Sequence, residues 1–151
     1  MTLNIRAALD NLVTLQGGLE ITSPSKHKIA RAWKYPPPPD TVLPETPCWT
    51  NEVTFVGEDR GIGGFRIQKF TVQMQLFIKE QQVEQAADIA AAFLEKMIQA
   101  LDGDVTLGQT VGLHKLRGGS PTIATLARSN AAYIGLDLYL DLELYDAVNY
   151  S

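Results

Sequence analysis

The chain has 151 residues, of which 45% are hydrophobic and 20% are charged, and its formal net charge is −4 at pH 7. This length and composition predict one globular domain over residues 1–151, and the acidic balance argues against non-specific binding to nucleic acid, which needs a basic surface. Cys48 is the only cysteine, which excludes an internal disulfide and suits a reducing cytoplasm.

The first half of the chain is predicted to contain one helix and three strands. Arg6 and Asp10 interrupt the apolar N-terminal positions, so we expect no signal peptide, and no apolar run approaches the ~20 residues of a membrane helix. We therefore expect a soluble intracellular protein that contacts no membrane. Helical spacing predicts a helix from Leu3 to Leu15, and alternation predicts strands over residues 27–35, 49–56 and 65–79.

Six prolines lie between Pro36 and Pro47. Proline has no amide N–H for the interior of a sheet, so this segment is predicted to be a stiff surface connection or a sheet edge. The glycine-rich residues 57–64 indicate a hairpin turn or a longer loop.

The second half switches from helical to strand-like periodicity. Apolar residues three or four positions apart predict a helix from Val83 to Leu101. A medium strand interrupted by glycines is expected over residues 105–116, then a polar loop over 117–131 and a long strand from Tyr133 to Asp146. The predicted fold class is α+β: a mostly antiparallel sheet of about five strands with two helices on one face, in the order α-β-β-β-α-β-β.

The last strand, YIGLDLYLDLELYD, alternates leucines with acids and tyrosines. We expect the leucines to face the second helix and Asp137, Asp141 and Glu143 to lie on the opposite, solvated face. Solvation alone is a sufficient explanation for these acids. However, the strand is about twice the usual length and carries no basic residue, and Asp137 and Asp141 would stand ~13 Å apart on one face. Such a surface would repel phosphates, so that DNA passes over it without being bound.

The arrangement of these elements resembles the tail-terminator, or tail-completion, proteins of long-tailed bacteriophages over nearly the whole chain. The resemblance rests on the N-terminal helix in LNIRAALDNL, the strand that enters a proline-rich turn in ARAWKYPPPPDTVLPETPCW, the strand pair TNEVTFVG and FRIQKFTVQMQLFI, and the alanine-rich helix VEQAADIAAAFLEKMIQAL. Two strands joined by a polar loop complete the pattern.

The resemblance implies a structural virion protein without catalytic residues or a cofactor. Proteins of this family form a ring, usually a hexamer, that caps the tail tube, ends its polymerisation and provides the surface for head attachment. The implied partners are further copies of the chain, the tail tube protein, the head connector protein, and DNA that passes through the hole without specific binding. The implied location is the head-proximal end of the tail in the virion, after assembly in the host cytoplasm. Within such a ring, Asp137, Asp141 and Glu143 are our candidates for the lumen surface.

A ring also requires each subunit to present two different contact patches. We name Arg60, Arg66, Arg117 and Arg128, in or near the two loops, as candidates for contacts with a neighbouring subunit or with the tube. Solvent-exposed loops with ordinary charges explain these arginines equally well.

Other kinds of site find less support in the sequence. The glycines of GIGG lead into a strand, whereas a phosphate-binding loop leads into a helix. His27, His114 and Cys48 lack metal-ligand spacing, and nothing in the sequence provides Cys48 with the partners of a nucleophile. Acids of the last strand, joined by Glu20 or Asp104, would suit magnesium or calcium, but no EF-hand-like loop accompanies them.

Three alternative functions stay open at this point. The first is another neck, connector or minor tail component of a phage. The second is a small enzyme with a carboxylate site on the last strand, which predicts a deep pocket over residues 137–143. The third is a module that binds peptides through the proline segment or a free sheet edge.

Overall fold

The computed structural model of the chain describes residues 4–39, 42–60, 65–79, 82–108, 110–118, 121–128 and 131–147. This part of the chain contains two helices and eight strands. In chain order they are α1 (Ile5–Gly17), β1 (Glu20–Ile21), β2 (His27–Lys28), β3 (Arg31–Trp33), β4 (Cys48–Arg60), β5 (Phe65–Ile78), α2 (Val83–Asp102), β6 (Leu113–Leu116), β7 (Thr122–Arg128) and β8 (Ala131–Ala147).

β8 lies in the middle of the main sheet and is paired along both of its sides. On one side it runs antiparallel to β5, which in turn runs antiparallel to β4. On the other side, β7 pairs with residues 131–137 and β6 pairs with residues 140–143. The sheet order is therefore β3-β4-β5-β8-β6, with β7 also paired to β8. β3 pairs in parallel with the first three residues of β4, and β1 and β2 form a separate small sheet.

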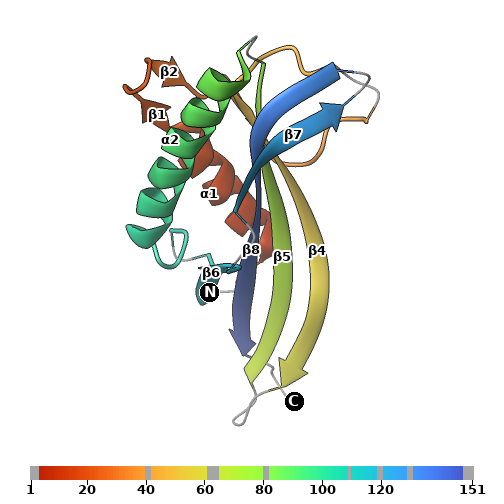
Figure 1. The fold of residues 1–151 in the computed structure, drawn as a ribbon. Helices are drawn as coiled ribbons and strands as arrows, with labels where there is room; N and C mark the ends of the chain where they lie inside the picture. Colours follow the sequence, from red (N-terminus) through yellow and green to blue (C-terminus); the bar gives the residue numbers. More distant parts are fainter. Residues whose placement is uncertain are drawn as a thin grey trace.

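Both helices pack on the same face of the main sheet, and the far ends of β4, β5 and β8 extend beyond them (Figure 1). The core lies between these layers because the strands and α2 present their apolar residues to each other. Fully buried side chains come from β8 (Leu136, Leu138, Leu140), β5 (Val72, Met74, Leu76) and α2 (Ile89, Phe93, Met97). Burial of each such side chain stabilises the fold by roughly 1.5–3 kcal/mol.

A buried pair of amides connects α1 to the sheet. The side chains of Gln16 and Asn51 exchange two hydrogen bonds of 2.8 Å, and both residues are completely buried. Asn51 also donates to the backbone carbonyl of Trp33 on β3. At its other end, α1 is capped by Asn4, whose side-chain oxygen accepts the N–H of Ala7 at 2.8 Å.

The opposite face of the sheet carries a second, smaller apolar cluster at one end. Cys48, Phe77 and Tyr133 are buried there together with Leu43 of the proline-rich segment. Burial raises the pKa of the Cys48 thiol to about 11. Tyr133 belongs to the alternating set that the sequence placed on a solvated face, but only 1% of it is exposed because this cluster covers it. The solvated part of this face therefore begins further along β8.

The predicted α+β class, with two helices and a mostly antiparallel sheet, is confirmed by the structure. The predicted number and order of strands differ from those observed. The loop predicted over residues 117–131 contains β7, because its threonines and Ile123 pair with the first half of β8. Among the described residues of the strand predicted over residues 105–116, only Leu113–Leu116 forms a strand, and Leu107 and Gly108 adopt positive φ angles of 47° and 65° in a turn. Residues 61–64 of the predicted glycine loop lie outside the described residues.

Candidate functional site

The candidate site is the polar face of the sheet, on the side opposite the helices. β8 presents Asp137, Asp141 and Glu143 on this face, and all three are partly exposed. The register places them opposite Gln75, Thr71 and Lys69 of β5. Because cross-strand partners share a face, the acids of β8 lie beside the polar and basic side chains of β5.

Asp141 is the most firmly held of the three acids. Its Oδ1 atom accepts hydrogen bonds from Arg117 Nη2 and from Thr71 Oγ1, both at 2.8 Å. Burial alone would raise the pKa of Asp141, but the hydrogen bonds from Arg117 and Thr71 and the positive charges of Arg117 and Lys115 outweigh it and lower that pKa below its usual value. Asp141 is therefore a charged structural partner with little basicity.

The position of Arg117 follows from the end of β6. Its backbone N–H donates to the carbonyl oxygen of Tyr139 at 2.9 Å, which holds the residue against β8. Its guanidinium carbon lies 5.1 Å from the centre of the Tyr139 ring, within the range of a cation–π contact. Hydrogen bonding to Asp141 and the charge of that carboxylate raise the pKa of Arg117.

The other two acids also have polar partners. Asp137 accepts a hydrogen bond from Gln73 Nε2 at 3.0 Å. Glu143 accepts one from the Tyr145 hydroxyl at 2.8 Å, and this bond raises the pKa of Tyr145. Lys69 stands opposite Glu143 and binds Asp59 of β4 at 2.8 Å. Of these three acids, Asp141 is held in an ion pair, while Asp137 and Glu143 accept hydrogen bonds from neutral side chains.

Three of the four arginines named from the sequence bind groups within the chain. Arg117 binds Asp141, Arg66 Nε lies 3.0 Å from a carboxylate oxygen of Glu58, and Arg128 donates to the carbonyl oxygens of Pro37 and Pro38 at 2.6 Å. Arg60 is exposed at the end of β4, opposite Arg66 in the register. The structure brings Arg60 and Arg66 together as cross-strand partners at the end of β4 and β5, whereas Arg117 after β6 and Arg128 on β7 lie elsewhere on the sheet.

Two open depressions mark the polar face. One of about 320 Å³ lies over the Arg117–Asp141 pair and is also lined by Val56, Lys69 and Glu143. The other, of about 440 Å³, lies between the proline segment and the sheet and is lined by residues that include Glu52, Gln73 and Arg128. Arg128 holds the proline segment at the rim of the second depression, because its guanidinium group donates hydrogen bonds to the backbone of that segment.

The remaining candidates from the sequence have structural contacts. His27 lies 2.9 Å from the Ser25 hydroxyl, and His114 Nε2 donates to the carbonyl oxygen of Asp104 at 2.8 Å. Glu20 faces Lys28 at 3.9 Å on the small sheet. Among the residues that the structure describes, no three histidine, cysteine, aspartate or glutamate side chains gather as a metal site would require.

The partners of the acids were not predicted from the sequence. Thr71 and Gln73 were placed on the polar face of their strand by simple alternation, but alternation gives no register between strands. Arg117 was assigned to a loop, and its position against β8 depends on the short strand before it. Finding these contacts would have required the pairing register of β5 against β8, which the sequence pattern does not provide.

In the described part of the chain, neither helix is long and apolar enough to cross a membrane. A scan against protein-family models gave no match, and neither did a search of curated proteins.

Proposed function

We propose that this chain is a structural virion protein of the tail-terminator type. In this proposal, copies of the chain form a ring, with a hexamer as the expected state, that caps the tail tube, stops its polymerisation and provides the head-attachment surface. The proposal rests on the sequence resemblance together with one structural observation: the molecule is a two-layer block whose long sheet leaves one broad polar face uncovered. A broad, open face of this kind suits contact with other parts of a particle better than catalysis on a small substrate.

The polar face is the surface that we assign to the lumen. Asp137, Asp141 and Glu143 would line the hole, as proposed from the sequence. Asp141 is paired with Arg117, whereas Asp137 and Glu143 accept hydrogen bonds from the neutral side chains of Gln73 and Tyr145, so the lumen would keep a negative charge. DNA would find no basic patch to bind and would pass without specific contacts.

Two alternatives belong to the same proposal. Another neck, connector or minor tail protein would share the block-like shape but would bind a different part of the particle. A small enzyme would use the depression over Asp141 and Glu143 as its active site. The contacts of Asp141 weigh against this enzyme, because a carboxylate with a lowered pKa that already accepts two hydrogen bonds is a poor proton acceptor.

The test is tail-tube polymerisation in the presence of the purified chain. The tube protein encoded in the same genome is allowed to polymerise with and without the chain, and tube lengths and tube ends are recorded by electron microscopy. We expect shorter tubes that carry a ring-shaped density at one end. Tubes of unchanged length with bare ends, at a large excess of the chain, would overturn the proposal. The heat-unfolded chain is the control for non-specific effects of added protein.

A further inference from the structure

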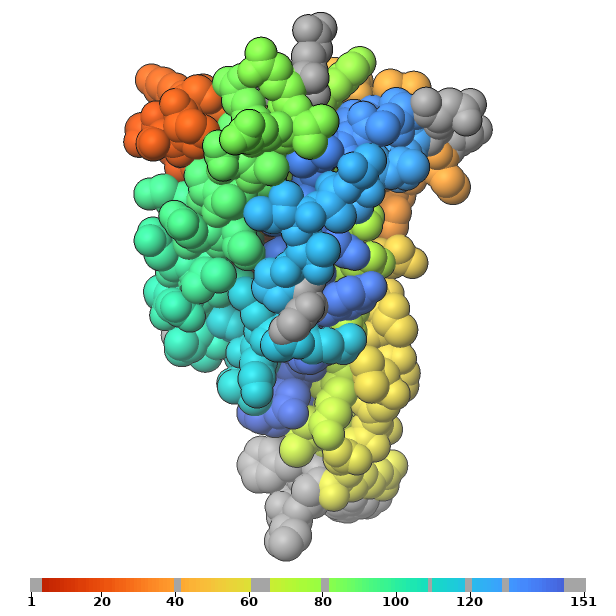
Figure 2. Space-filling model, viewed as in Figure 1, coloured from red at the N-terminus to blue at the C-terminus, as the bar shows by residue number. Residues whose placement is uncertain are grey.

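In the strand order the main sheet has one edge at β4 and another at β6 and β7 (Figure 1), and both edges reach the surface that Figure 2 shows. One edge is β4, which beyond Thr50 pairs only with β5 among the described residues. Residues 51–60 of β4 thus present an outer side of about ten residues, or ~33 Å. The other edge is formed by the outer sides of β6 and β7, which pair only with β8 in the described part of the chain. Long open edges are templates for pairing with another strand.

The β4 edge carries an exposed aromatic side chain. Phe55 is 57% exposed and packs edge-to-face against Phe70 of β5, with ring centres 5.4 Å apart. The register pairs Phe55 with Phe70, and Phe70 with Leu142, which is buried under the helical layer. Phe55 therefore projects on the side of the sheet that bears the helices.

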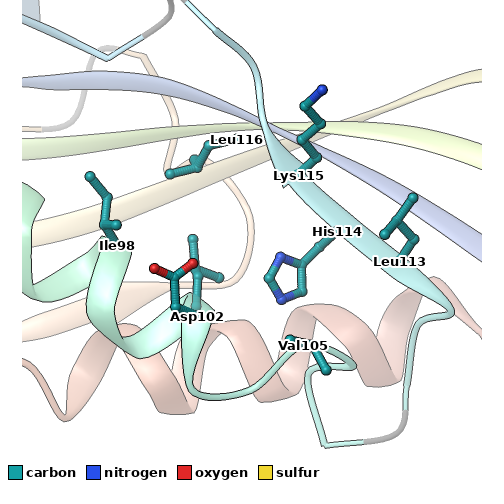
Figure 3. A pocket seen from close by; sticks show the side chains of 8 residues that line it. Ile98, Asp102, Val105, Leu113, His114, Lys115 and Leu116 are labelled. Atoms are coloured by element: carbon teal, nitrogen blue, oxygen red, sulfur yellow. The ribbon is translucent and has the colours of Figure 1, made fainter.

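The opposite edge carries a cavity on that same side. A space of about 300 Å³ lies between the end of α2, the turn after it, and β6 (Figure 3). Ile98 and Val105 line it and are exposed, Val105 at 66%, while His114 and Leu116 of β6 point toward it. Lys115 points away, toward the polar face, because its register partner is Asp141. The cavity lies beside an open strand, and its lining is mixed, because the carboxylate of Asp102 and the ring of His114 accompany the apolar side chains.

The charges of the strands alternate in sign across the sheet. β4 carries three acids and one arginine, and β5 carries Arg66 and Lys69 without an acid. β8 carries four acids and no basic residue, and β6 and β7 carry Lys115 and Arg128 without an acid. The strand at one edge is thus acidic in sequence and the strands at the other are basic, although Glu58 and Asp59 of β4 already pair with Arg66 and Lys69 of β5. Opposite charges on adjacent strands stabilise pairing, and like charges destabilise it.

We propose that the β4 edge of one copy docks on the β6–β7 edge of a second copy, with Phe55 entering the cavity lined by Ile98 and Val105. This head-to-tail contact continues the alternation of charge from one sheet into the next. It also matches the faces, since the aromatic residue and the cavity both lie on the helical side, while Lys115 and Glu52 both lie on the polar side. A contact between two β4 edges would place two acidic strands side by side, so the second copy binds through its other edge.

A contact between two different edges is heterologous, and it generates a ring if the rotation between copies closes. This edge contact would join the subunits of the ring proposed above, and it rests on that proposed function only in that copies of the chain associate with each other. It assigns the subunit contacts to Phe55 and the α2–β6 cavity. The arginines named from the sequence are not needed for it.

The test uses three matched substitutions of exposed apolar residues. Phe55→Glu alters the β4 edge, Val105→Glu alters the cavity, and Val42→Glu, at a residue that is 52% exposed in the proline segment, is the control. Sedimentation velocity over a range of concentrations measures the mass of each chain. We expect the wild type and Val42→Glu to form the same species of several times 16.6 kDa, and each edge variant to weaken association at least tenfold. Circular dichroism and thermal unfolding show that each variant is folded, and Ile98→Glu replaces Val105→Glu if that variant is not.

The decisive measurement is an equimolar mixture of Phe55→Glu and Val105→Glu. Phe55→Glu keeps an intact β6–β7 edge, and Val105→Glu keeps an intact β4 edge. The mixture is therefore expected to form a dimer of twice 16.6 kDa that grows no further. A Val105→Glu variant that dimerises alone would show a contact between like edges and overturn the proposal. A wild type that stays monomeric at its highest soluble concentration would also overturn it.

The tube assay separates this inference from the proposed function. If the chain self-associates through these edges but leaves tube growth unchanged, the edge contact stands and the tail-terminator role fails. If the chain caps tubes and Phe55→Glu caps them as well as the wild type does, the role stands and the edge contact fails.

Discussion

Arg117 binds Asp141 through two nitrogen atoms, with Nη2 2.8 Å from Oδ1 and Nε 3.4 Å from Oδ2. The same Nη2 donates to the Thr71 hydroxyl at 3.1 Å, so the residues form a closed triangle across β5, β8 and the end of β6. This triangle gives the acidic strand a basic partner that its own sequence lacks. It also means that changes at Arg117 act on the isolated chain, before any assembly.

We expect a double-mutant cycle of Arg117→Gln and Asp141→Asn to show a small favourable coupling at pH 7, because both side chains are nearly half exposed and water screens the pair. Asp141 has a lowered pKa in the folded chain, so its contribution to stability is complete above the usual aspartate pKa. The contribution is lost as the pH falls through the lowered pKa of the folded state. Urea unfolding of the wild type, the two single variants and the double variant measures this coupling at neutral pH and again at acid pH.

The Lys28–Glu20 pair is the control for this cycle, since its atoms are 3.9 Å apart and both side chains are more exposed. Its coupling should be close to zero at either pH. An Arg117–Asp141 coupling that is absent at pH 7, or that persists unchanged in strong acid, would contradict the interpretation of the triangle.

Much of the two-layer core could be predicted from the sequence because periodicity reports which side chains share a face. The leucines of β8 and the stripe of Ile89, Phe93 and Met97 on α2 are buried as their spacing indicates. The same reasoning placed Tyr133 in solvent, and there it was wrong. Alternation identifies two faces but does not show that the proline segment folds back over one end of the second face.

The candidate site was less predictable because it depends on contacts between distant strands. Asp141 and Thr71 are 70 residues apart, and only the register of β5 against β8 brings them together. β7 was missed because its threonines are common both in loops and in strands, and its partner β8 decides between the two. The exposure of Phe55 was not predicted either, because it depends on β4 pairing along this stretch only with β5 among the described residues.

The Gln16–Asn51 pair offers a test of how α1 is held. Gln16→Leu would leave the buried amide of Asn51 with fewer partners, and we expect a loss of about 1–3 kcal/mol in the free energy of unfolding. The double variant Gln16→Leu, Asn51→Leu should lose less than the sum of the single variants, because it removes both buried amides. Urea unfolding measures all three. Gln99→Leu on the exposed face of α2 is the control and should change stability by no more than about 0.5 kcal/mol; additive losses for the pair would contradict the reciprocal bonding.

The buried thiol of Cys48 provides a probe of opening at the end of the sheet. Its side chain has no exposed surface, and its pKa of about 11 leaves little thiolate at pH 8. We therefore expect a thiol reagent to label the folded chain at least 100-fold more slowly than the chain unfolded in guanidinium chloride, in a reaction followed by absorbance. Equal rates in the two states would show that the cluster of Cys48, Phe77 and Tyr133 does not close over the thiol.

Gly135 is the residue of β8 that limits how closely β5 can approach. It lies between Phe77 of β5 and Ala124 of β7, and a Cβ atom at this position would overlap the backbone carbonyl oxygen of Leu76. A backbone atom cannot swing aside as a side chain can, so Gly135→Ala must separate the two strands locally. We expect a loss of roughly 1–3 kcal/mol in the free energy of unfolding and faster amide hydrogen exchange in β5 beside residue 135.

Gly57 of β4 is the matched control for Gly135, since it is also a strand glycine but a Cβ atom there would meet no atom within 4 Å. Gly57→Ala should leave stability unchanged or raise it by about 0.4–1 kcal/mol, because alanine restricts the unfolded chain. If both variants behaved alike, close contact between β5 and β8 would not be the reason for a glycine at position 135. A loss confined to Gly135→Ala, with altered exchange limited to β5 and β8, ties the effect to the carbonyl of Leu76.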